Sequence, residues 1–183
     1  MKLEQLPLAG ALALTPDVFH DDRGFFKETY SLERYRACGV KELFVQDNLS
    51  LSRRGVLRGL HGDWRMAKLV SVVRGTAYDA IVDLRPSSPT RGRHWAMRLT
   101  ASQGVQLYVP AGFLHGFLAL EDETLLAYKQ SAPYDPASEF AVAWDDPQLG
   151  IEWPLGGAAP ILSARDAASP RLGTLATNGA DPR

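Results

Sequence analysis

The chain has 183 residues, of which 45% are hydrophobic and 22% are charged, and its formal net charge is −1. These values are typical of a globular domain and exclude an intrinsically disordered chain or a fibrous repeat. A nearly neutral chain also lacks the basic field that non-specific binding to nucleic acid or an anionic membrane requires. We therefore expect one soluble domain that binds a small molecule, with neither nucleic acid nor a membrane as a partner.

The N-terminal segment contains an apolar run over residues 6–14, which Pro7 interrupts. The run is far shorter than the roughly 20 residues of a membrane helix and lacks the basic start of a leader, so we interpret it as a first strand. Cys38 is the only cysteine, and no disulfide or thiolate zinc site can form within one chain. These features favour the cytoplasm.

One short helix is predicted at Ser31–Cys38, with Ser31 as its N-cap and Gly39 after its last turn. After it come short segments that are rich in β-branched and aromatic residues and end at Gly, Pro, Asp or Ser, which is typical of strands. The predicted strands are 44–51, 56–61, 68–73, 76–84, 94–100, 105–109, 117–120, 125–130 and 140–144. The turn Arg74-Gly75 predicts that 68–73 and 76–84 form a hairpin. A second short helix is predicted over 164–169.

The recurrence of strands predicts the fold class. There is no parallel βαβ pattern, repeat period or glycine-rich phosphate loop, so the chain is expected to be all-β, a jelly-roll sandwich or barrel with one or two short helices. Such a fold holds a ligand between its sheets, so functional side chains should point inward from strands. We assign residues 1–166 to a single domain and expect the polar tail 167–183 to be mobile.

The charges are unevenly distributed along the chain. All the charged residues of the segment 135–152 are acidic, whereas the segment 53–74 contains one acidic residue and six basic ones. A charge run is usually a solvated face, and the alternative is that this segment binds an anionic ligand such as a phosphate. The six bases are Arg53, Arg54, Arg58, Arg65, Lys68 and Arg74.

His61 ends the segment Gly55-Val-Leu-Arg-Gly-Leu-His61. Strict alternation along a strand would place Arg58 and His61 on opposite faces. A glycine inside a strand often marks a bulge, and a bulge at Gly59 would bring both side chains into one pocket.

His115 lies in the pattern G-x5-P-x-G-x2-H, from Gly104 to His115. This spacing resembles the second motif of the cupins, a family of jelly-roll barrels, although the H-x-H metal pair of their first motif is missing. A competing hypothesis is an Fe(II) oxygenase that uses His61, Asp63 and His115 as a facial triad. No arginine that could bind a keto-acid cosubstrate occurs between His115 and Lys129.

A proton-transfer site would use these residues differently. Removing a proton beside a carbonyl requires a base, a cation for the enolate oxygen, and an acid on the opposite face of the carbon. We assign these roles to His61, Lys68 and Tyr128, with Tyr134 as the weaker candidate for the acid. A carboxylate on the second imidazole nitrogen would fix the tautomer of the base, and the candidates are Asp79, Asp83 and Asp166.

Several collinear motifs carry a resemblance that covers about residues 20–166. They are Asp22-Arg-Gly-Phe-Phe-Lys-Glu28, Gln46-Asp-Asn-Leu-Ser50, Gly55-Val-Leu-Arg-Gly-Leu-His61, Lys68-Leu-Val, Val82-Asp-Leu-Arg85, Pro110-Ala-Gly-Phe-Leu-His-Gly-Phe117, Tyr128-Lys, Gly150-Ile-Glu-Trp-Pro154 and Ile161-Leu-Ser-Ala-Arg-Asp166. In these motifs the chain resembles the dTDP-4-dehydrorhamnose 3,5-epimerase family of cupin-fold enzymes.

The resemblance implies a homodimer without metal or cofactor that epimerises a nucleotide-linked 4-keto-6-deoxy sugar at C3 and C5. By motif position His61 corresponds to the base, Asp166 to its partner, Lys68 to the oxyanion-binding group and Tyr128 to the acid. The resemblance further implies that the substrate, a nucleotide-diphosphate sugar, is bound by Arg23, Glu28, Gln46, Asn48, Arg58, His115, Glu139 and Arg165.

Two departures from the family pattern concern the substrate. The stretch Gly62–Ala67 is shorter than the family's, and Arg165 stands where a lysine is expected. An epimerase acting at C3 only, or on a GDP-linked heptose, is therefore an alternative within the family. Outside it, the alternatives are the iron oxygenase and a non-catalytic cupin that binds a sugar nucleotide.

Overall fold

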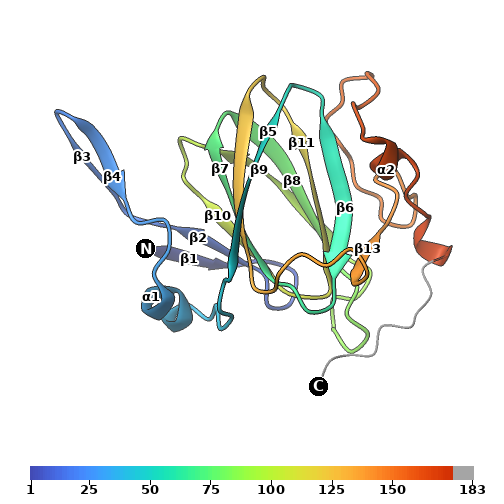
Figure 1. Cartoon of the computed structure of the whole chain (residues 1–183), viewed down its shortest axis with the longest axis horizontal. Coiled ribbons are helices and arrows are strands. Elements are labelled where there is room, and N and C mark those ends of the chain that lie inside the picture. Colours follow the sequence, from blue (N-terminus) through green and yellow to red (C-terminus); the bar gives the residue numbers. More distant parts are fainter. Residues whose placement is uncertain (175–183) are drawn as a thin grey trace.

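The computed structural model describes residues 1–174 as two facing antiparallel sheets with a separate two-stranded hairpin (Figure 1). The six-stranded sheet has the order β1 (Lys2–Gln5), β2 (Leu12–Thr15), β10 (Gln106–Val109), β7 (Lys68–Arg74), β12 (Thr124–Gln130) and β5 (Gln46–Ser52). The five-stranded sheet has the order β13 (Glu139–Ala141), β6 (Leu57–Asp63), β11 (Phe113–Ala119), β8 (Thr76–Asp83) and β9 (His94–Thr100). This sandwich confirms the predicted all-β, cupin-like fold class.

The helices are short, as expected, and the hairpin is additional. The helix α1 (Leu32–Ala37) ends one residue before Cys38, α2 (Ala164–Ala167) is a single turn, and a 3₁₀ turn spans Leu172–Thr174. The hairpin consists of β3 (Val18–Asp21) and β4 (Gly24–Lys27), which project away from both sheets (Figure 1). No described helix has the length and hydropathy needed to cross a membrane.

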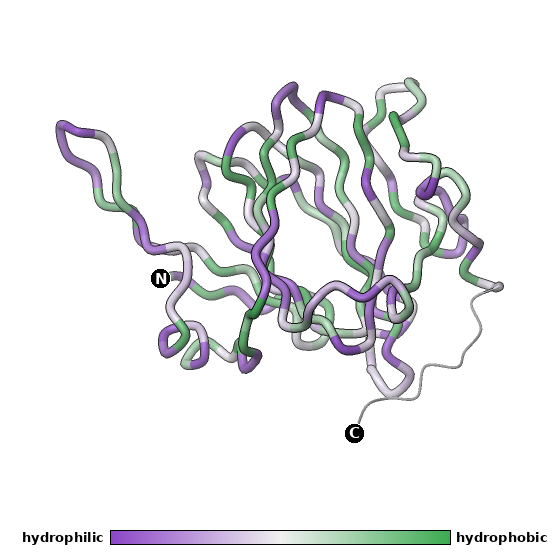
Figure 2. The backbone as a smooth tube through the Cα atoms, in the orientation of Figure 1, coloured by the Kyte–Doolittle hydropathy of each residue, from purple (hydrophilic) through white to green (hydrophobic). Residues whose placement is uncertain are grey.

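The core lies between the two sheets and forms because alternate strand residues face inward. Val70 and Val72 of β7 pack there with Ile81 of β8 and Phe117 of β11. A second apolar cluster lies on the outer face of the five-stranded sheet, where Val142 and Leu149 cover Leu60 and Val82. Figure 2 shows these hydrophobic stretches alternating with hydrophilic ones along the strands.

Two sequence interpretations were wrong. Strands β7 and β8 do not pair with each other, because the chain bends at Gly75 (φ +77°) and crosses from one sheet to the other. The run 6–14 is not one strand: Gly10 (φ +81°) and the hydrogen bond from Leu6 N to Ala11 O form a turn, and β1 precedes it. The hairpin β3–β4 was not predicted. Its strands do not alternate between buried and exposed residues, and the two consecutive phenylalanines after Gly24 are both exposed.

The C-terminal segment packs along the outside of β6. Ala143 N donates a hydrogen bond to Pro170 O at 2.8 Å, and Leu172 N donates one to Asp146 Oδ2 at 2.6 Å. The first part of the predicted tail therefore contacts the body of the domain. The rest of that tail, residues 175–183, lies outside the described residues.

Candidate functional site

A cavity of about 430 Å³ opens between the two sheets. It is lined by ten of the twelve side chains that the family resemblance implies, Gln46, Asn48, Arg58, His61, Lys68, His115, Tyr128, Glu139, Arg165 and Asp166, and by Tyr134, the weaker candidate for the acid. Five further side chains that were not predicted also line it: Ser50, Phe117, Leu126, Gln130 and Ser163. Period-two alternation could have found Ser50 and Gln130, because they lie two or four residues from predicted site residues on the same strands.

Strand register brings these residues together from distant parts of the sequence. On the six-stranded sheet, Gln130 pairs with both Gln46 and Lys68, and Tyr128 pairs with Asn48. On the facing sheet, His115 of β11 pairs with His61 of β6. The cavity therefore has two polar walls.

The bulge predicted at Gly59 is present. Arg58 pairs with Phe117 and His61 pairs with His115, so a step of three residues along β6 matches a step of two along β11. Gly59 has φ +123°, and a Cβ atom there would lie 2.6 Å from Gly116 Cα. Only glycine fits this position, and the extra residue turns Arg58 and His61 into the same cavity.

The carboxylate partner of His61 is Asp166. The distance from His61 Nε2 to Asp166 Oδ1 is 2.6 Å, and Ser163 Oγ donates to the other carboxylate oxygen at 2.8 Å. Burial raises the pKa of the Asp166 carboxyl, but the hydrogen bonds from His61 and Ser163 outweigh burial and hold that pKa below its usual range. An ionised Asp166 accepts a hydrogen bond from the Nε2–H group, so in the neutral imidazole the Nδ1 atom carries the lone pair.

The two other candidate carboxylates have different partners. Asp79 is fully buried, and both of its oxygens lie within 3.0 Å of His115 Nε2. Asp83 accepts hydrogen bonds from Arg85, Ser88 and Thr90, and it anchors the 84–90 loop away from the cavity. Of the three, only Asp166 contacts His61.

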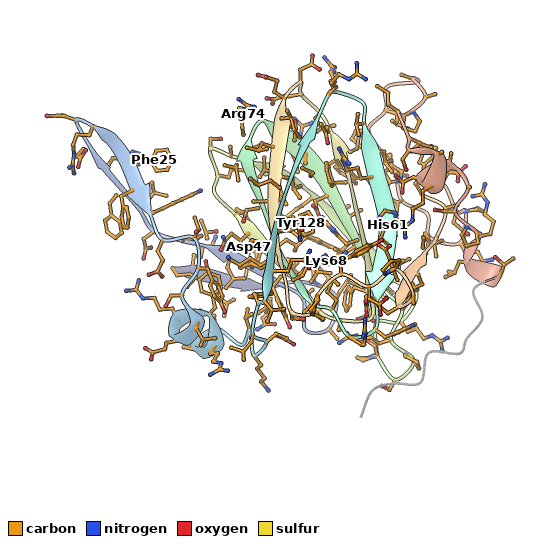
Figure 3. All side chains as sticks on the ribbon, viewed as in Figure 1. Phe25, Asp47, His61, Lys68, Arg74 and Tyr128 are labelled. Carbon is orange, nitrogen blue, oxygen red and sulfur yellow. The ribbon has the colours of Figure 1, made fainter. Side chains whose placement is uncertain are left out.

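Lys68 and Tyr128 lie on neighbouring strands of the six-stranded sheet, and His61 faces them from the other sheet (Figure 3). Burial lowers the pKa of the Lys68 ammonium, while the charges of Glu139, Asp79 and Asp63 oppose this effect. The ammonium has a single hydrogen bond in the described chain, of 3.5 Å, to His61 O. Burial raises the pKa of Tyr128, so its hydroxyl keeps a proton that it can donate.

A polar cluster forms the mouth of the cavity beside His61. Glu139 Oε1 lies 3.8 Å from His61 Nδ1, and its other oxygen forms a close ion pair with Arg165. The Tyr134 hydroxyl lies 3.2 Å from both Glu139 and Arg165. An anionic ligand group could draw Arg165 from Glu139 here.

The basic segment contributes only two of its six cations to the cavity. Arg58 is held by Ser52 Oγ and Leu51 O at 3.1 Å each, and Lys68 lies deeper. Arg53 and Arg54 are exposed, Arg65 pairs with Asp63 and Asp135, and Arg74 pairs with Glu123. Of the six cations considered for an anionic ligand, only Arg58 and Lys68 therefore line the cavity.

Two predicted binding residues lie outside the cavity of their own chain. Arg23 sits at the tip of the hairpin and pairs with Asp21, and Glu28 pairs with Arg34. Figure 3 shows the hairpin, marked by Phe25, well separated from His61 and Tyr128.

The facial triad of the iron hypothesis does not assemble. The Asp63 carboxylate accepts hydrogen bonds from Arg65 N at 2.8 Å and from Ser138 Oγ at 2.5 Å. His61 and His115 each bind a carboxylate of their own. Among residues 1–174, no group of three His, Cys, Asp or Glu side chains is arranged to hold a metal ion.

The chain is similar to known proteins in both sequence and structure. The sequence profile of the family described as dTDP-4-dehydrorhamnose 3,5-epimerase matches residues 5–174. A dTDP-4-dehydrorhamnose 3,5-epimerase of Pseudomonas aeruginosa is 45% identical over 169 residues, which are 91% of this chain and 93% of that protein.

Two solved structures are similar over nearly the whole chain. The dTDP-6-deoxy-D-glucose-3,5-epimerase of Legionella pneumophila, in complex with dTDP-4-keto-L-rhamnose, has a TM-score of 0.91 at 39% identity and covers 96% of this chain and 94% of its own. A 3'-monoepimerase of Streptomyces bikiniensis, in complex with dTDP-quinovose, has a TM-score of 0.86 at 37% identity and covers 92% and 87%.

We predict that the hydrogen bond between His61 and Asp166 contributes to the free energy of unfolding in a pH-dependent way. Because the pKa of Asp166 is lowered on folding, its contribution is complete above the unfolded-state pKa, about 3.9, and is lost as the pH falls through the lower folded pKa. We expect Asp166→Asn to lower the free energy of unfolding at pH 7 by about 1–3 kcal/mol. Urea denaturation at pH values from 7 to 3 should show that the difference in free energy of unfolding between the wild-type protein and the variant becomes smaller below about pH 4.

The matched control is Asp47→Asn, which removes an exposed carboxylate paired with Lys129. Its effect on stability should stay within about 0.5 kcal/mol. An Asp166→Asn deficit that is the same at pH 7 and pH 3 would contradict an ionised Asp166 in the folded protein.

Proposed function

The chain belongs to the dTDP-4-dehydrorhamnose 3,5-epimerase family, and we propose that it is an isomerase that converts dTDP-4-dehydro-6-deoxy-D-glucose to dTDP-4-dehydro-L-rhamnose. The observation that carries this proposal is the placement of His61 and Tyr128 on facing sheets with Lys68 beside Tyr128 (Figure 3). A base and an acid on opposite walls can remove a proton from one face of a carbon and return one to the other.

The chemistry follows from the 4-keto group, which makes the hydrogens at C3 and C5 acidic. His61 Nδ1 takes the proton, and the imidazolium so formed is stabilised by Asp166. The electron pair moves to O4, where the Lys68 ammonium stabilises the enolate. Tyr128 then protonates the carbon from the opposite face, the configuration inverts, and solvent restores both side chains. Turning the sugar ring lets the same pair act on the second carbon.

The other cavity residues bind the substrate in this proposal. Arg58 and Arg165 supply cations for the diphosphate, and Gln46 and Asn48 supply amides. His115, held by Asp79, faces the sugar from the same wall as His61. No metal or cofactor enters this sequence of steps, and we propose that the reaction requires none.

A homodimer is the proposed assembly, because two surfaces of the chain are incompletely buried. The hairpin exposes Phe19, Phe25 and Phe26 by 64–70%, and the six-stranded sheet exposes Leu49 and Val73 on its outer face. An isolated two-stranded hairpin is only marginally stable, and apolar patches of this kind mark interfaces. We propose that the hairpin packs on a second copy, in the cytoplasm, and carries Arg23 and Glu28 to the partner's cavity.

Solvent exchange tests the proposed reaction. The purified protein is incubated with dTDP-4-dehydro-6-deoxy-D-glucose in D₂O with a chelator, and NMR measures deuterium at each carbon. We expect deuterium at C3 and C5, none with His61→Ala, and exchange without inversion with Tyr128→Phe, because that variant lacks the acid.

The outcomes separate the candidate functions. Exchange at C3 alone favours the monoepimerase alternative, to which the Streptomyces bikiniensis structure gives weight. No exchange in the wild-type protein would contradict the proposed activity and leave a sugar-nucleotide-binding protein. Activity lost on chelation and restored by a metal would contradict the metal-free mechanism.

Mixed dimers test the proposed role of the hairpin. His61→Ala and Arg23→Glu are each expected to be strongly impaired as homodimers. In a mixed dimer, the intact pocket of the Arg23→Glu protomer receives the intact hairpin of the His61→Ala protomer. Random co-assembly should therefore restore about a quarter of wild-type activity, since half the dimers hold one complete site. If activity stays at the mean of the two homodimers, Arg23 does not act on a partner's site.

A further inference from the structure

Three buried side-chain atoms of the described residues have no hydrogen-bond partner within the chain: Asn48 Nδ2, Ser50 Oγ and Gln130 Oε1. All three residues line the central cavity. Buried polar atoms in native proteins are almost always paired, because leaving one unpaired costs about 1–3 kcal/mol. Their concentration in one cavity indicates atoms that are available to a ligand.

Gln130 has the most informative position of the three. It is the last residue of β12, and its side chain is 5% exposed. The register pairs it with Lys68 on β7 and with Gln46 on β5, and Tyr128 lies two residues earlier on the same inward face. Gln130 and Lys68 are therefore neighbours across the sheet and line the same cavity, and in the proposed reaction the Lys68 ammonium faces the substrate carbonyl.

We propose that Gln130 positions the substrate by accepting a hydrogen bond from a sugar hydroxyl next to the carbonyl that Lys68 binds. An amide oxygen only accepts hydrogen bonds, so it cannot bind the carbonyl oxygen and requires a donor. The C3 hydroxyl, one carbon from the C4 carbonyl, is such a donor. This inference rests on the proposed function and adds a residue that fixes which ring carbon faces His61.

Because the Gln130 amide oxygen has no partner among the described residues, a substitution can distinguish a role in ligand binding from a role in the fold. If the amide oxygen serves only the substrate, an apolar side chain of the same length removes an unsatisfied buried acceptor and leaves the free protein equally or more stable. If Gln130 supports the fold, the same change destabilises the protein. Gln130→Met meets this requirement, and Gln103→Met, in an exposed loop, is the matched control.

The experiment measures binding by calorimetry in the His61→Ala background, which cannot turn over the ligand. The probes are dTDP-4-dehydro-6-deoxy-D-glucose and dTDP, which lacks the sugar. We expect Gln130→Met to weaken binding of the sugar nucleotide about tenfold, or about 1.4 kcal/mol, and to leave binding of dTDP and the melting temperature unchanged or raised. With His61 intact, the deuterium ratio of C3 to C5 should also change.

Each result decides the inference. Equal affinity of Gln130→Met and the Gln103→Met control for the sugar nucleotide would overturn it, as would equal losses for both probes. A melting temperature lowered together with both affinities would assign Gln130 to the fold. Failure of the proposed function gives a different result, in which the wild-type chain neither exchanges deuterium nor distinguishes the sugar nucleotide from dTDP.

Discussion

The hydrogen bond between His61 and Asp166 is the interaction on which the site depends. It joins a residue of the five-stranded sheet to one 105 positions later, across 2.6 Å. Asp166 occupies the first turn of α2, where the N-cap Ser163 Oγ accepts a hydrogen bond from Asp166 N and donates one to Asp166 Oδ2. In the proposed mechanism, the C-terminal segment that covers the outer face of the sheet therefore also sets the tautomer of the base, and the reaction requires this segment to be packed in place.

The second constraint is the burial of charge between the sheets. Burial removes water from the Lys68 ammonium and lowers its pKa. The negative charges of Glu139, Asp79 and Asp63 act in the opposite direction and raise that pKa. Among residues 1–174 the ammonium has one hydrogen bond, to His61 O, so in the proposed reaction an enolate oxygen would find an unsatisfied donor already in place. Asn48, Ser50 and Gln130 repeat this pattern with neutral atoms. The cavity holds unpaired polar groups at a cost in stability, as functional sites commonly do.

Much of the fold could be predicted because its signals are local, whereas most of the site residues were predicted from the family resemblance. Alternation and turn residues located most strands, and Gly59 predicted the bulge that joins Arg58 to His61. Strand pairing could not be predicted in this way. The sequence of β7 and β8 resembles a hairpin, but the two strands lie in opposite sheets. A bend at Gly75 is compatible both with a hairpin and with a crossing between sheets. The residues alone left Asp79, Asp83 and Asp166 open as the carboxylate beside His61, and the family resemblance pointed to Asp166. All three are buried and hydrogen-bonded in the structure, and the C-terminal segment brings Asp166 into contact with His61.

In the proposed complex, one ring carbon lies between His61 and Tyr128 while its neighbouring carbonyl contacts Lys68. A crystal structure of the Tyr128→Phe variant with dTDP-4-dehydro-6-deoxy-D-glucose measures this directly. We predict O4 within about 3.2 Å of Lys68 Nζ, with His61 Nδ1 and the substituted aromatic ring on opposite faces of the sugar. A sugar bound with its carbonyl away from Lys68, or with both side chains on one face, would contradict it.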